Sequence, residues 1–253
     1  MSSVYLYYEY ITLFVGILFY STFFSAQYKI DQTYNEFQNK DISSSLGFLG
    51  VIICIELVFT YCDMGTICPS LSGSAIIYPM LIWVLIFGGI KMLMLSSPGV
   101  KSAFSDVIGY FFVYGRTNEL LTELLLKPDE GEDPTHLKNN QLISEIIGDK
   151  GLVINTLVPG NFEKIWNSFK NISNPEVYNN KIKKQQLLNY VVIRDRIGEC
   201  CWYLWCGILV ISVVSLYTST ITCDLSQAQA QQNAAAYNAA VNAGSADETY
   251  VTD

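Results

Sequence analysis

Four long apolar segments constrain the fold of this chain more than any other feature of its sequence. A helix needs about 20 predominantly apolar residues to cross a bilayer. Segments of this kind run over about Tyr8–Ala26, Ser45–Cys62, Ser74–Leu95 and Cys200–Ile221. Tyr and Trp residues crowd several of their ends, as is typical of membrane interfaces. The sequence therefore predicts a mainly α-helical, multi-pass membrane protein with four transmembrane helices.

The composition supports this prediction and excludes one class of partner. Hydrophobic residues make up 51% of the 253 residues, and charged residues only 15%, against roughly 25% charged residues in an average soluble domain. The net charge of −8 gives no basic surface for phosphate groups, so we expect no nucleic-acid partner. No basic region precedes the first apolar run, so a removable signal peptide is not predicted.

The distribution of Lys and Arg predicts an orientation. Four spans place residues 27–44 and 96–199 on one side of the membrane, and both termini with residues 63–73 on the other. All fifteen Lys and Arg lie on the first side or, for Lys91, near the span end that faces it. Because positive residues near span ends stay in the cytosol, we expect residues 96–199 on the cytosolic side and both termini on the opposite side.

This threading divides the chain into four parts. Residues 1–95 hold three spans with short loops, 96–199 form a polar, mostly helical domain docked at the membrane, 200–222 form the fourth span, and 223–253 form a low-complexity, acidic tail rich in Ala, Gln and Asn. Residues 152–158 fit either a strand or a buried helical turn. The basic stretch before the fourth span is expected to be helical and to continue into that span.

Glu56 lies in the middle of the second predicted span. A carboxylate inside a membrane is costly in isolation, so we expect Glu56 to face the bundle interior, protonated and hydrogen-bonded. Matching depths in the spans suggests four neutral partners: Thr12, Tyr78, Ser215 and Tyr217. One interpretation is a structural interhelical contact, and the other is the proton or ion site of a small channel or transporter. The structural interpretation is favoured, because transporters usually carry several such groups.

Cysteines and basic residues suggest two further sites. Cys62 and Cys68 both fall on the non-cytosolic side, where an oxidising environment permits a disulfide, and Cys223 is an alternative partner for either. A basic group before the fourth span is predicted to bind anionic lipid headgroups as well as to set the topology. Its members are Lys181, Lys183, Lys184, Arg194 and Arg196.

The sequence contains no phosphate-binding loop, nucleophile elbow, zinc-protease motif or dinucleotide fingerprint. The single histidine, His136, lies beside an acidic loop, without a CxxC pair to complete a metal site. We therefore expect a non-enzymatic protein with no cofactor and no bound metal.

The segment KSAFSDVIGYFFVYGRTNELLTELLL, residues 101–126, resembles membrane proteins packed inside the virions of large icosahedral DNA viruses of the phycodnavirus kind. The resemblance implies a minor capsid protein that anchors the internal membrane of the virion to the capsid shell. Capsid proteins would then contact an interaction surface that includes Phe111, Phe112, Trp166 and Phe169. A supernumerary subunit of another membrane complex is the alternative assembly role.

Overall fold

The computed structural model describes residues 3–67, 73–125, 150–221, 231–232, 234–239 and 241. These residues are helical apart from short connections and one isolated β-bridge between Leu125 and Ser173. Four helices are long and apolar enough to cross a membrane, as the sequence predicted. They are α1 (Ser3–Phe19), α2 (Tyr34–Ile67), α3 (Ile77–Ser96) and α10 (Lys181–Thr220).

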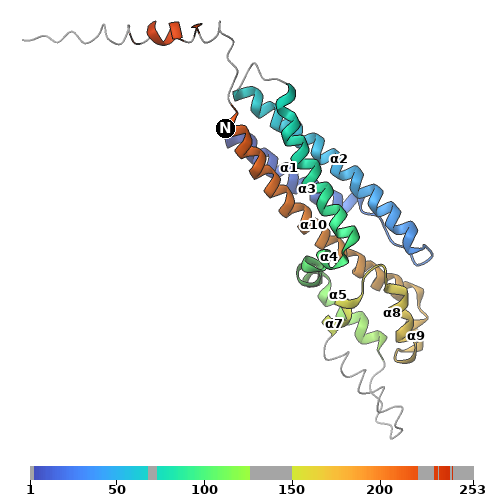
Figure 1. Ribbon diagram of the computed structural model, residues 1–253. Helices are drawn as coiled ribbons and strands as arrows, with labels where there is room; N and C mark the ends of the chain where they lie inside the picture. The colour runs from blue at the N-terminus through green and yellow to red at the C-terminus, as the bar shows by residue number, and fades with distance from the viewer. Residues whose placement is uncertain are drawn as a thin grey trace, which may run out of the picture.

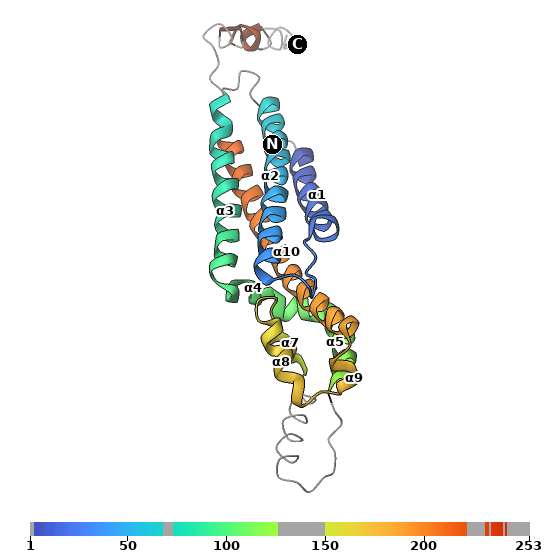
Figure 2. The same cartoon turned by 90° about the vertical axis from the view of Figure 1, so that its right-hand side faces the viewer.

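The four long helices lie side by side in a bundle with two distinct ends (Figures 1 and 2). A π-helical segment, η1 (Tyr20–Phe24), extends α1, and a 3-10 turn, η2 (Gly73–Ile76), precedes α3. The starts of α1 and α3 and the last residues of α2 and α10 lie together at what we call the terminal end. The polar domain lies at the opposite end, which we call the domain end.

The domain consists of short helices packed against the first half of α10 (Figure 1). They are α4 (Pro98–Phe104), the π-helical segment η3 (Ser105–Gly109), α5 (Tyr110–Leu124), α7 (Lys150–Thr156), α8 (Phe162–Ser168), the 3-10 turn η4 (Phe169–Asn171) and α9 (Pro175–Tyr178). Helix α7 shows that residues 152–156 of the ambiguous segment 152–158 are helical, and the last two residues follow the end of this helix. The low-complexity tail is described only at the few residues from 231 to 241 given above, which are helical and exposed.

Helix α2 begins eleven residues before the predicted second span, because Thr33 and Glu36 cap its start. The backbone N–H of Glu36 donates to the Thr33 hydroxyl at 3.4 Å, and the N–H of Thr33 donates to the Glu36 carboxylate at 3.3 Å. This reciprocal pair satisfies two N–H groups that would otherwise lack partners at a helix start. Residues 34–44, predicted as part of a loop, are therefore helical.

Helix α10 joins the bundle and the domain in one element, as the sequence predicted. The side chain of Asn180 accepts hydrogen bonds from the backbone N–H groups of Ile182 and Lys183 and caps its start. The helix then continues for 40 residues without interruption. The predicted boundary at residue 200 is therefore no structural break, since the domain and the fourth span share a single helix.

Two hydrophobic cores form on either side of the junction between bundle and domain. The bundle core gathers side chains from all four long helices, including Leu13, Ile52, Phe87 and Tyr203. The domain core is built mainly from α5, α7, α8 and residues 187–191 of α10. Only 22–33% of each apolar span is buried inside the structure, which suits contact of the other residues with lipid chains.

Candidate functional site

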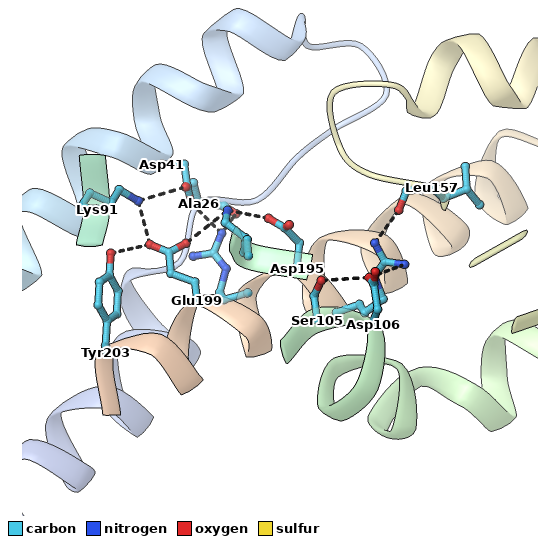
Figure 3. Close-up of polar contacts among 12 residues, drawn as sticks. Ala26, Asp41, Lys91, Ser105, Asp106, Leu157, Asp195, Glu199 and Tyr203 are labelled. Atoms are coloured by element: carbon cyan, nitrogen blue, oxygen red, sulfur yellow. Dashed lines mark hydrogen bonds and ion pairs between the residues drawn. The ribbon is translucent and has the colours of Figure 1, made fainter. Parts of the chain in front are cut away.

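Six charged side chains meet where the bundle joins the domain (Figure 3). They come from α2, α3, α4 and α10, and we refer to them as the junction network. Its members are Asp41, Lys91, Lys101, Asp195, Arg196 and Glu199. Three are cations and three are carboxylates, so the network is neutral as a whole. Neutrality matters because a buried charge without a partner is strongly destabilising.

Glu199 on α10 is the centre of the network. Lys91 Nζ donates to its Oε1 atom at 2.7 Å, and the Tyr203 hydroxyl donates to the same oxygen at 2.6 Å. Lys101 Nζ lies 3.7 Å from the second oxygen. The Glu199 side chain is only 2% exposed. One carboxylate thus holds α3, α4 and α10 together.

Asp41 and Arg196 extend the network to α2 and to the end of the first helix. Arg196 Nη2 donates to the Asp41 carboxylate at 2.8 Å and to the carbonyl oxygen of Ala26 at 3.2 Å. Lys91 Nζ lies 3.9 Å from the other Asp41 oxygen. Every long helix, or the segment directly after it, is therefore tied to the same cluster of charges.

Lys101 completes the network from α4, the first helix of the domain. Its Nζ atom donates to Asp195 at 2.9 Å. Burial by itself lowers the pKa of Lys101, but the carboxylates of Asp195 and Glu199 more than offset this effect and raise the pKa above its ordinary value. Lys101 therefore stays charged at any physiological pH.

Two glycines let the domain approach α10 next to the network. A Cβ atom on Gly198 would lie 2.9 Å from the backbone nitrogen of Ser105, and one on Gly109 would meet the carbonyl oxygen of Arg194. Any larger residue would push η3 away from α10. The short distance between the two backbones places η3 directly beside the junction network.

The structure corrects the predicted headgroup site. Arg194 is fully buried, where it donates to the carbonyl oxygens of Ile154 and Leu157, and Arg196 is 7% exposed within the network. Lys183 and Lys184 form ion pairs with Glu123 and Glu163 inside the domain, and Lys181 is exposed. In a continuous α10, residues 181–184 lie about 24–28 Å before residue 200 along the helix axis, too far for close contact with headgroups there.

The predicted interaction surface divides into two parts. Phe111 and Phe112 are 78% and 68% exposed, as a docking surface requires. Trp166 and Phe169 are only 2% and 4% exposed and belong to the domain core, so their assignment to a surface was wrong. Their amphipathic spacing reflects their place in the domain core, together with residues of α5 and α10.

Glu56 is completely buried, as predicted, but its predicted partners are wrong. Both carboxylate oxygens lack a hydrogen-bond partner among the described residues. The Tyr217 ring instead packs against Tyr78 at a tilt of 40°, with ring centroids 4.4 Å apart, and its hydroxyl donates to the Ala75 carbonyl oxygen at 3.4 Å. Thr12 and Ser215 supply no bond to Glu56 either. The contacts near Glu56 come from α1 and α2 instead, where the Thr60 hydroxyl lies 2.9 Å from the Glu56 carbonyl oxygen and 3.4 Å from the Glu9 carboxylate.

Cys62 is exposed and carries a free thiol. Its predicted disulfide partner Cys68, like the alternative Cys223, lies outside the described residues.

The geometry of the junction network suits a structural connection between the bundle and the domain. Each of its charges faces an opposite charge, and the pairs lie between packed helices. Among the residues described above, no group of three or more His, Cys, Asp or Glu side chains is placed to hold a metal ion. The chain matches no family model, no curated protein and no solved structure.

Proposed function

We propose that the protein is a non-enzymatic, structural membrane protein that anchors a lipid bilayer to a large protein assembly. The observation that carries this proposal is the junction network on a continuous α10. Following the sequence resemblance, the assembly is the capsid shell of a large DNA virus and the bilayer is its internal membrane. The domain of residues 96–199 then faces the shell from the cytosolic side of that membrane.

An anchor has to transmit force between the bilayer and its partner without coming apart. Helix α10 runs through both hydrophobic cores, so pulling on the domain pulls directly on a span. The junction network adds ion pairs from the buried Lys91 and Arg196 and from the partly buried Lys101 at the level where the two cores meet. A rigid connection of this kind suits a mechanical role.

The partner surface in this proposal is the apolar face of η3 and α5. Val107, Phe111 and Phe112 are 69%, 78% and 68% exposed there, close to the bundle. Exposed aromatic side chains on a rigid element are the residues that most often dominate the binding energy of protein interfaces. Phe111 is the most exposed of them and is the residue to test.

The test is to extract the protein from its native membrane in mild detergent, measure the particle mass and identify the companion proteins. We expect a very large particle rich in shell proteins. Phe111→Asp should release a small particle with an unchanged unfolding temperature. Ser168→Asp, which adds the same charge at an exposed position of α8, should behave as the unaltered protein.

A small homo-oligomer without companions, recovered from the unaltered protein, would refute the anchoring role. Co-purification with redox or ATP-synthase subunits would instead support a supernumerary subunit of an energy-transducing complex.

A channel or transporter is the second candidate function, because Glu56 is buried with two unpartnered carboxylate oxygens. Glu9, Thr60 and Asp63 are buried on the neighbouring turns of α1 and α2. Such intramembrane carboxylates mark proton pathways in many transporters. The anchoring role is favoured, because the described residues show no unwound helix in the middle of a span, which transporters commonly use at their binding sites.

A further inference from the structure

A long groove runs between the first helix and α10 at the domain end of the bundle. Its cavity volume is about 960 Å³, near the upper limit of about 1,000 Å³ for typical small-molecule pockets. One wall is formed by α1, η1 and residues 25–31, and the facing wall by α10. Ile108 of η3 and Phe112 of α5 close its side. The groove is separate from Glu56 and borders the junction network only at Arg196.

The groove crosses the level at which a bilayer would end. A hydrocarbon layer of about 30 Å corresponds to about 20 helical residues. Counted from the terminal end, this length reaches about residue 200 of α10 and about residue 24 of the first helix. The lining residues Phe14, Leu18 and Leu204 therefore lie at the depth of lipid chains, and residues 25–31 lie at or beyond the headgroups. Lipid in the surrounding bilayer has direct access to the apolar part.

The polar part of the groove is lined by Lys29, Asp31 and Arg196. Arg196 already pairs with Asp41 through its Nη2 atom. Lys29 is exposed and has no ion-pair partner among the residues described. Arg196 also has an unused donor, because its Nη1 atom is buried without a hydrogen-bond partner in the described structure. Both groups suit a phosphate, which accepts hydrogen bonds and carries negative charge.

The wall that carries Lys29 is held in place by α10. Gln185 Nε2 donates to the Tyr28 carbonyl oxygen at 2.8 Å, and the Ile30 N–H donates to Gln185 Oε1 at 3.0 Å. These two bonds fix the backbone on both sides of Lys29. The lysine is thus presented from an ordered segment beside the groove.

We propose that this groove binds a glycerophospholipid from the surrounding bilayer. An acyl chain lies along Phe14, Leu18 and Leu204, and the headgroup, with its phosphate at Arg196, extends out of the bilayer along the groove toward Lys29. This site goes beyond the anchoring role and does not depend on it, since it requires only that the bundle lies in a bilayer. A lipid held in this way fills the space between the first helix and α10.

The experiment is to purify the full-length protein in mild detergent, exchange the detergent extensively and measure retained phospholipid by native mass spectrometry. We expect the unaltered protein to retain a single phospholipid per chain. Ser21→Trp, which places an indole ring in the groove, should abolish retention. Thr22→Trp is its matched control, because Thr22 is the exposed neighbour that does not line the groove.

The charge contact is tested with a second pair of variants. Lys29→Glu should lose the phospholipid, and Lys40→Glu should retain it, because Lys40 is exposed on α2 outside the groove. Unchanged unfolding temperatures show that each variant is folded. Loss of all phospholipid from the unaltered protein, with only detergent bound, would overturn the proposal. Equal retention by Ser21→Trp and Thr22→Trp would also overturn it. Neither result bears on the Phe111→Asp assembly test.

Discussion

Replacing Glu199 with Gln tests whether the junction network locks the bundle to the domain. The substitution keeps the shape of the side chain and an acceptor for the Tyr203 hydroxyl, but it removes the central negative charge. Lys91 then keeps only Asp41, at 3.9 Å, and Lys101 keeps Asp195 at 2.9 Å. The network becomes three cations against two carboxylates in a buried place.

Removing one partner of a buried ion pair costs about 3–5 kcal/mol. For a chain of this length each kcal/mol lowers the unfolding temperature by roughly 2–4 °C, so we expect a decrease of about 6–20 °C. Lys91→Met alone should have an effect in the same range. The double variant should be less destabilised than the sum of the two, by about 1–3 kcal/mol, since it restores the balance of charges.

The assay is thermal unfolding of the purified protein in detergent, followed by circular dichroism. Lys183→Gln is the control, because its ion pair with Glu123 has side chains that are 33% and 43% exposed. An exposed pair of this kind contributes about 0–1 kcal/mol. The reasoning fails if Glu199→Gln lowers the unfolding temperature no more than Lys183→Gln. It also fails if the effects of Glu199→Gln and Lys91→Met are simply additive.

Two further predictions use the same assay. Gly109→Ala should destabilise the protein by about 1–3 kcal/mol, because the added methyl group meets the Arg194 carbonyl oxygen. Gly115→Ala is the control and should be neutral or slightly stabilising, because a methyl group at Gly115 would lie in open space. Equal effects of the two substitutions would contradict the close packing of η3 on α10. Glu56→Leu should stabilise the bundle by about 1–3 kcal/mol, because two unsatisfied buried oxygens are removed. Liposomes that contain the unaltered protein and liposomes that contain Glu56→Gln should show the same proton flux. A proton flux that is lost in Glu56→Gln would favour the transport role.

The four long helices were predictable because a bilayer sets both the length and the apolar character of a span. The continuity of α10 was also predictable, since the residues between Lys181 and Cys200 contain no glycine or proline before Gly198. The early start of α2 was missed, although Thr33 and Glu36 have the spacing of a capping box. Hydropathy gives no sign of this helix start, because the first turns of α2 are polar.

The junction network was not predictable from one sequence. Asp41, Lys91, Lys101 and Glu199 are spread over nearly 160 positions, and each resembles an ordinary charge near the end of a span. Their pairing depends on how far each helix is shifted along its neighbours, which is set by side-chain contacts. In the same way, the pattern around Trp166 identified an apolar face but not the partner that covers it.

The unbroken length of α10 has a mechanical consequence. Forty residues at 1.5 Å each give a rod about 60 Å long, of which one half lies in the bundle and the other supports the domain. A span responds to a change in bilayer thickness by changing its tilt. A rotation of about 10° about one end of such a rod moves the other end by about 10 Å. Local thinning or thickening of the bilayer is therefore converted into a sideways displacement of the domain and of whatever is bound to it.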